Sequence, residues 1–145
     1  MTRPIEYDNL IKTKAFEAVA PTPGAIAGFL RNAADYLATA ESLDPERHLQ
    51  IFTLAYEGYF QLVQATLELY EVRTREAGRN LAIQRVPTSL GVSAAEFAFI
   101  TKAHERRNGT SYVSPFPPVS KAEAAAMLEI LRKYLPLARA LTARQ

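Results

Sequence analysis

Apolar residues recur every three or four positions along most of the chain, which is the spacing of helices that bury one face. The first such segment covers about residues 23–42, where Thr22 is expected to cap the helix and Pro23 to begin it. A second segment starts at Asp44 and carries a wide apolar face to about Glu76. The pattern therefore predicts two long helices in the first half of the chain.

Two Ser-x-x-Glu signatures predict further helix starts. Ser93 precedes Glu96, and Ser120 precedes Glu123, at the spacing at which each side chain satisfies a free backbone N–H of the other residue. A third long helix is expected from about Ser93 to Asn108, and a fourth after Ser120. Both starts rest on reciprocal capping rather than on apolar periodicity alone.

The expected ends of these helices depend on residues that break or close a helix. Asn108-Gly109 tolerates the left-handed conformation that ends helices, and Pro136 is expected to kink or end the last one. The prolines in residues 110–119 predict an extended crossing. Residues 80–86 form either a short helix or an irregular connector before the next proline.

The whole pattern predicts an all-α fold, because no segment shows the alternation of a strand. The economical architecture is an up-and-down four-helix bundle. Residues 1–22 are less regular and form either a strap across the bundle or a short extra helix. We therefore expect an N-terminal strap, 1–22, followed by a single bundle domain, 23–145.

Composition agrees with one compact soluble domain, since 48% of the 145 residues are hydrophobic and 22% are charged. No apolar run is long enough to cross a membrane, and the N-terminal residues carry charges where a secretory signal needs apolar ones. We expect a cytoplasmic protein with no membrane partner.

Several kinds of chemistry are excluded or unsupported by residue content. The chain has no cysteine, which excludes disulfides, thiolate nucleophiles and Cys-ligated metals. Its two histidines, His48 and His104, are far apart in the sequence, and no phosphate-binding glycine loop is present. We therefore expect neither a metal nor a cofactor.

Charge is distributed unevenly along the chain. Residues 1–72 carry 5 basic against 10 acidic side chains, whereas residues 73–107 carry 7 against 3. Such a basic segment either gathers a phosphate-rich ligand or forms a solvated surface. The basic side chains of this segment are Arg73, Arg75, Arg79, Arg85, Lys102, Arg106 and Arg107.

The third predicted helix has a face that begins apolar and ends polar, running from Phe97 and Ile100 to His104, Arg107 and Asn108. An inward-facing arginine beside an imidazole can hold a phosphate through two hydrogen bonds. Arg107 can equally pair with a carboxylate such as Glu57 on the second helix. The structural alternative makes His104 a partly buried histidine and Asn108 a helix cap.

The stretch from Arg106 to Tyr112 resembles the signature of HEPN domains, an arginine and a polar residue followed by a histidine. Residues 7–12, 54–57, 86–91 and 104–108 are similar to a bacterial branch of that family, in matching order along most of the chain. In this chain Tyr112 stands where the histidine is expected.

The resemblance implies an up-and-down helical bundle that commonly forms a homodimer, with the motif arginine facing a groove at the dimer interface. Active members of the family are metal-independent endoribonucleases or toxins, often encoded beside a nucleotidyltransferase that neutralises them. A partner of that type is therefore an expectation for this chain. The implied ligand-binding residues are Arg106, Arg107, Asn108, Tyr112, His104 and Tyr56.

Tyrosine is a poor general base near neutral pH, because its reference pKa is about 10. The leading hypothesis is therefore a domain that binds a nucleotide, RNA or a partner protein without efficient cleavage. The alternative is a weak metal-independent endoribonuclease, in which Arg107 stabilises the phosphorane and His104 or Tyr112 moves protons. A purely structural interaction module is the third hypothesis.

Large aromatic residues on the second helix also predict a homodimer, since Tyr56, Tyr59, Phe60 and Tyr70 offer more apolar surface than one side of a small bundle usually needs. Another expectation concerns the core. The residues expected to be largely buried are Phe52, Tyr56, Phe60, Val63, Phe97, Ile100, Leu128 and Leu131.

Overall fold

The computed structural model describes residues 3–75 and 79–143, apart from the side chains of Asn80, Leu81, Ser111 and Tyr112. Most of the described residues are helical, as the sequence predicts. In chain order the elements are α1 (Ile5–Lys12), β1 (Phe16–Ala18), α2 (Ala25–Ser42), α3 (His48–Leu69), β2 (Val72–Thr74), α4 (Arg79–Arg85), α5 (Pro87–Leu90), α6 (Ala94–Tyr112) and α7 (Lys121–Thr142).

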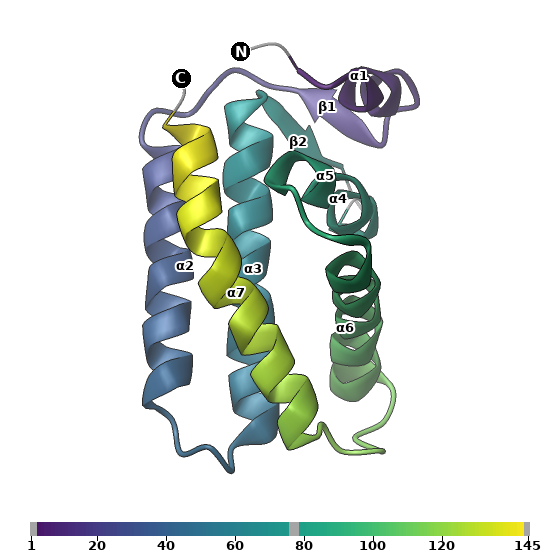
Figure 1. Cartoon of the computed structure of the whole chain (residues 1–145). Coiled ribbons are helices and arrows are strands. Elements are labelled where there is room, and N and C mark those ends of the chain that lie inside the picture. The colour runs from purple at the N-terminus through teal and green to yellow at the C-terminus, as the bar shows by residue number, and fades with distance from the viewer. Residues whose placement is uncertain (1–2, 76–78, 144–145) are drawn as a thin grey trace.

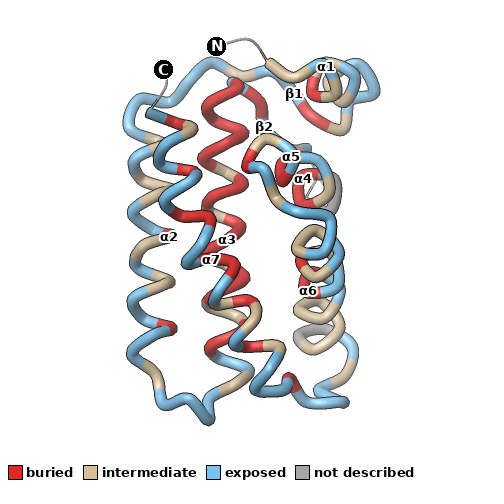
Figure 2. Tube along the Cα trace, viewed as in Figure 1, coloured by how far each residue is buried: buried red, intermediate tan, exposed pale blue. Residues whose placement is uncertain are grey.

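The four long helices α2, α3, α6 and α7 run alternately up and down, and the shorter elements gather at the end of the molecule where both labelled termini lie (Figure 1). Helix α3 packs against α2 and α7, with α6 and α4 on its remaining side. Buried positions therefore follow α3 along most of its length (Figure 2). This explains why its apolar face is the widest in the sequence.

Most of the predicted core is confirmed. Phe97 and Leu128 differ, because each is only half-buried. The buried residues of the predicted set are Phe52, Tyr56, Phe60, Val63, Ile100 and Leu131.

Both predicted capping boxes are present. The Ser93 hydroxyl accepts from the Glu96 backbone N–H at 3.2 Å, and the Glu96 carboxylate accepts from the Ser93 N–H at 3.2 Å. Ser120 and Glu123 make the same reciprocal pair at 3.1 and 3.0 Å. These contacts fix where α6 and α7 begin.

The predicted caps of the first two long helices are wrong. Helix α2 begins at Ala25, after Gly24 in a left-handed conformation with φ of 80°, and the Thr22 hydroxyl accepts instead from Arg73. Helix α3 begins at His48, because the Asp44 carboxylate closes a turn by accepting from the Glu46 N–H at 2.9 Å.

The predicted end of the second helix is also wrong, whereas the all-α fold class is confirmed for the described residues apart from one small two-stranded sheet. Helix α3 stops at Leu69, and Glu71 has a φ of 58°, a left-handed conformation that turns the chain away from the helix axis. The next residues form β2, which pairs antiparallel with β1. The N-terminal segment thus supplies backbone partners that local periodicity cannot show.

The expected stop at Asn108-Gly109 is wrong, since α6 continues to Tyr112. The Asn108 side chain reaches one turn back toward His104 instead of capping the helix end. Pro136 lies inside α7 and does not end it, because the helix runs on to Thr142.

The N-terminal segment forms both a short helix, α1, and a strand, β1. Tyr7 fastens it to the rest of the molecule: its ring packs edge-on against Phe16 and Tyr70, at centroid distances of 5.8 and 5.4 Å. Its hydroxyl lies 3.1 Å from the Ser89 hydroxyl of α5. A fully buried aromatic side chain therefore anchors residues that the sequence left undecided.

The aromatic side chains that suggested a homodimer are all buried within one chain: Tyr56, Tyr59, Phe60 and Tyr70. These four side chains therefore contribute almost no exposed surface to an interface with a second copy. The homodimer stays a prediction that rests on the family resemblance alone.

Gly58 lies where α3 meets α2 and α7, and it supplies a test of this packing. A Cβ atom at Gly58 would lie 2.6 Å from Leu131 Cδ2 and 2.9 Å from Tyr36 Cβ. We expect Gly58→Ala to destabilise the protein by about 1–3 kcal/mol through overpacking. The matched control is Gly28→Ala in α2, where the new methyl meets nothing within 4 Å. This variant should stabilise by up to about 1 kcal/mol. Urea unfolding measures both, and equal stability of the two variants would contradict the packing.

Candidate functional site

Two arginines from different helices converge on one carboxylate of α3. The Nη2 nitrogen of Arg107, on α6, lies 2.8 Å from Glu57 Oε1, and the Nη2 nitrogen of Arg79, on α4, lies 3.2 Å from Glu57 Oε2. The sequence offers two partners for Arg107, a phosphate or a carboxylate such as Glu57, and the structure shows the pair with Glu57. All three side chains are largely but not fully buried, with Arg79 the most exposed at 33%. We call Glu57, Arg79 and Arg107 the arginine pair site.

Aromatic rings of α3 lie beneath the two guanidinium groups. The Arg79 guanidinium carbon is 3.8 Å from the Phe60 ring centroid, a close cation–π contact. Arg79 and Arg107 also lie 5.7 and 5.8 Å from the Tyr56 ring centroid. The rings and the shared carboxylate together hold both cations in place.

His104 lies beside this site and is buried. Its Nδ1 is 2.6 Å from the Tyr56 hydroxyl, and its Nε2 is 3.4 Å from the Asn108 side-chain nitrogen. Arg107 donates to the Asn108 amide oxygen at 3.2 Å, which turns the amide NH2 toward the imidazole. A neutral imidazole that accepts at Nε2 carries its proton on Nδ1, so His104 donates to the Tyr56 oxygen.

Two titratable groups of this cluster, His104 and Tyr56, are neutral at physiological pH. Burial, together with the positive charges of Arg79 and Arg107, lowers the pKa of His104 below its ordinary value. Burial raises the pKa of Tyr56 to about 12. With Tyr56 and His104 uncharged, two guanidinium groups face one carboxylate, and the cluster carries one net positive charge.

The structure brings together four of the six implied binding residues: Tyr56, His104, Arg107 and Asn108. Arg106 lies apart from them: its Nε donates to Glu123 of α7 at 2.9 Å, and its Nη2 donates to the Pro118 carbonyl in the preceding loop at 2.8 Å. Helical geometry explains this, since adjacent residues face different sides of α6. The Tyr112 side chain lies outside the described residues.

Sequence reasoning did not single out Arg79. It counted this residue within the basic middle segment, three members of which make other contacts in the structure: Arg73, Arg75 and Arg106. Arg73 donates to Thr22, and Arg75 lies 3.6 Å from Glu17. Arg79 lies at the start of the short helix α4. Its spacing from Glu57 in the sequence gives no indication that the two side chains meet.

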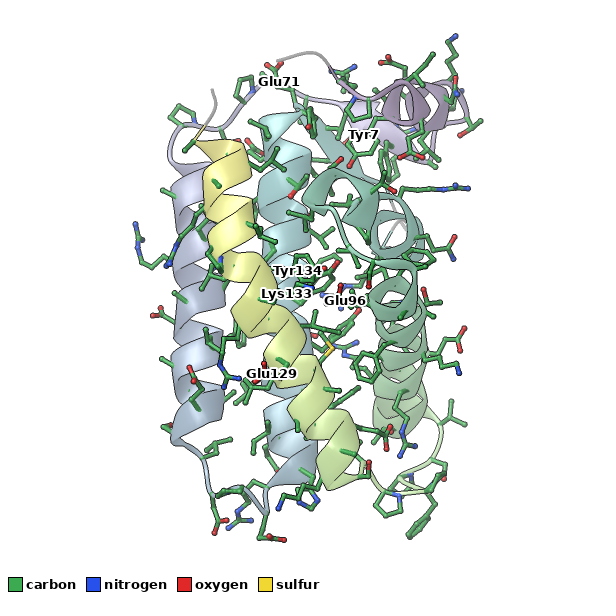
Figure 3. All side chains as sticks on the ribbon, viewed as in Figure 1. Tyr7, Glu71, Glu96, Glu129, Lys133 and Tyr134 are labelled. Atoms are coloured by element: carbon green, nitrogen blue, oxygen red, sulfur yellow. The ribbon has the colours of Figure 1, made fainter. Side chains whose placement is uncertain are left out.

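A second polar contact joins α6 to α7. Glu96 accepts from the Tyr134 hydroxyl at 2.5 Å and from the Lys133 ammonium at 2.9 Å, and the three residues lie together in Figure 3. The Tyr134 hydrogen bond, with those from Lys133 and Ser93, lowers the pKa of Glu96 to about 2. Helix α6 is thus held by charged and polar contacts at its start as well as at the arginine pair site.

Neither a scan against protein-family models nor a search of curated proteins finds a match for this chain. Within residues 3–75 and 79–143, no helix is both long and apolar enough to cross a membrane. In the same part of the chain, no group of three His, Asp or Glu side chains is arranged to hold a metal ion. The site must therefore be interpreted from its own geometry.

The buried neutral imidazole predicts a pH dependence of stability. Since the pKa of His104 is lower in the folded than in the unfolded protein, the unfolded state binds the proton more readily. The free energy of unfolding should therefore fall as the pH drops below about 6.5. In the His104→Gln variant this part of the decline should disappear.

The measurement is urea unfolding between about pH 7.5 and pH 5. His48→Gln is the matched control, because His48 lies at the start of α3 near Glu46 and should leave the decline intact. A parent protein whose stability does not change over this range would contradict the buried neutral state of His104.

Proposed function

We propose that the chain is a HEPN-like helical domain that binds the phosphate groups of RNA or a nucleotide at the arginine pair site, without efficient cleavage. The proposal includes the HEPN-like arrangement of the four long helices. The observation that carries it is the convergence of Arg79 and Arg107 on the two oxygens of one carboxylate. Planar guanidinium groups recognise a phosphate through the same paired geometry.

The local charge favours the replacement of Glu57 by a phosphate group between the two arginines. A phosphate diester carries one negative charge and two free oxygens, so it can take the place that Glu57 occupies between the two arginines. The cluster has one net positive charge before the ligand arrives, and the buried Tyr56 and Phe60 rings beneath the guanidinium groups hold the two cations in place. Glu57 then acts as a competitor that keeps the arginines oriented in the absence of ligand.

Efficient cleavage is not part of the proposal, because neither nearby group is placed as a general base. Both nitrogens of His104 are occupied by Tyr56 and Asn108, and the ring is buried. The Tyr56 hydroxyl, with a pKa of about 12, holds its proton near neutral pH. Removal of a ribose 2′-hydroxyl proton thus lacks an available acceptor among these residues.

Binding is tested by fluorescence anisotropy with a labelled single-stranded RNA at fixed salt concentration. We expect Arg107→Ala to weaken binding by about 1.5–3 kcal/mol, the cost of losing a hydrogen bond to a charged group. Arg107→Lys should recover little of it, because ammonium lacks the planar fork. Glu57→Gln should tighten binding, because it removes the competing charge and keeps an oxygen acceptor.

Arg132→Ala is the matched control for this test, since Arg132 is an exposed arginine of α7 paired with Glu41. It should bind RNA as the parent does. The melting temperature of each variant shows whether it remains folded. If Arg107→Ala and the parent bind RNA and nucleotides equally, the proposal fails and a structural interaction module becomes the better interpretation.

A cleavage assay in excess EDTA separates binding from catalysis. The parent should leave a structured RNA intact, whereas Tyr112→His restores the histidine of the family pattern and should create ribonuclease activity. Adding Arg107→Ala to Tyr112→His should abolish that activity, because the phosphorane loses its cation. Vigorous cleavage by the parent would instead establish the metal-independent endoribonuclease.

A further inference from the structure

A second candidate site lies at the end of the molecule where α3 and α7 finish and α2 begins. A cavity of about 750 Å³ opens there, within the size range of small-molecule sites. Its walls are mostly apolar and come from the loop before α2, from α2 itself and from the ends of α3 and α7. They include Pro21, Pro23, Ile26, Leu30, Leu69 and Ala143.

Glu68 is the buried charged residue in this wall, with only 5% of its surface exposed. Its Oε1 accepts from the Thr22 backbone N–H at 2.7 Å, which ties the loop to α3. Among residues 3–75 and 79–143, no lysine, arginine or histidine forms an ion pair with it. A carboxylate so deeply buried is normally paired, because burial of a lone charge is costly.

The other charges near the cavity are exposed to solvent. Glu71 and Arg139 lie in its wall, and Arg73 donates to the Thr22 hydroxyl beside it. Figure 3 shows Glu71 at this end of the molecule. Solvent screens exposed charges strongly and buried ones weakly, so Glu68 dominates the field inside the cavity.

Helix polarity adds to this negative field. The C-terminal ends of α3 and α7 both lie at the cavity, and the carbonyl groups of a helix C-terminus carry partial negative charge. The N-terminal end of α2, which carries partial positive charge, also lies at the cavity. The negative charge of Glu68 and of the two helix C-termini therefore exceeds the partial positive charge of the one helix N-terminus.

We propose that this cavity binds a small organic cation, a protonated amine with an apolar body. The ammonium group pairs with Glu68 and donates to nearby oxygens, while the apolar body lies against Ile26, Leu30 and Leu69. This site is separate from the arginine pair site and takes a ligand of the opposite charge. Its ligand class follows from a buried carboxylate at an apolar wall.

The test uses hexylammonium chloride as the probe and isothermal titration calorimetry as the measurement. Hexylammonium should bind the parent at millimolar concentration or below, and hexanoate should not. Methylammonium, which has the charge without the apolar body, should bind at least tenfold more weakly. Stronger binding of hexanoate than of hexylammonium would overturn the proposal.

Glu68→Gln is the deciding variant, because the amide oxygen still accepts from Thr22 while the charge is removed. Hexylammonium affinity should fall at least tenfold. Glu129→Gln is the matched control, since Glu129 is an exposed carboxylate farther along α7 from this end (Figure 3), and it should leave affinity unchanged. Equal binding by the parent and Glu68→Gln would mean that Glu68 only holds the loop, and would overturn the proposal.

Arg144 lies outside the described residues, and Arg144→Ala tests whether the chain itself supplies the cation. Unchanged hexylammonium binding by this variant supports a site for an external ligand. Binding by Arg144→Ala alone, with none by the parent, would overturn the proposal, because the chain's own guanidinium would then be the counter-ion of Glu68. Melting temperatures of all variants check that each remains folded.

Discussion

The shared carboxylate of Glu57 is the interaction on which the arrangement of α4 and α6 depends. Helix α3 packs against α2, α4, α6 and α7, so a largely buried charge on it such as Glu57 needs partners from the elements around it. Glu57 has two partners, Arg79 and Arg107, and these bring α4 and α6 to the same point of α3. Removing one partner of such a largely buried pair costs more than the pair itself contributes, because the remaining charge stays desolvated. The same constraint keeps His104 neutral beside them.

Much of the fold could be predicted because the long helices depend on local signals. Apolar spacing indicated α2 and α3, and the two capping boxes located the starts of α6 and α7. The errors lie where a distant segment decides the local conformation. Strands β1 and β2 have three residues each, too few to show alternation, and each exists because the other supplies backbone partners. Asn108 did not cap α6, because His104 and Arg107 engage its side chain.

The candidate site could be predicted in part for the same reason. His104, Arg107 and Asn108 share one face of α6, so helical spacing alone relates them, and Glu57 was a reasonable carboxylate partner for Arg107. Arg79 escaped notice because its position depends on how α4 packs against α3. Arg106 was included through the family motif, although one helical step of rotation turns it toward Glu123. A motif names neighbours in sequence, whereas a site requires neighbours in space.

The anchoring of Tyr7 has a consequence for the order in which the protein is made and folded. Residues 5–18 leave the ribosome well before their partners, which come much later in the chain: Tyr70 and β2 follow α3, and Ser89 is 82 residues beyond Tyr7. Contacts of such large sequence separation form slowly, because the intervening chain must first be ordered. During synthesis, α1 and β1 therefore remain undocked, with Tyr7 exposed, until α5 has left the ribosome. Residues 5–18 are therefore among the last parts of this fold to be fixed in place, although they are made before the residues that hold them.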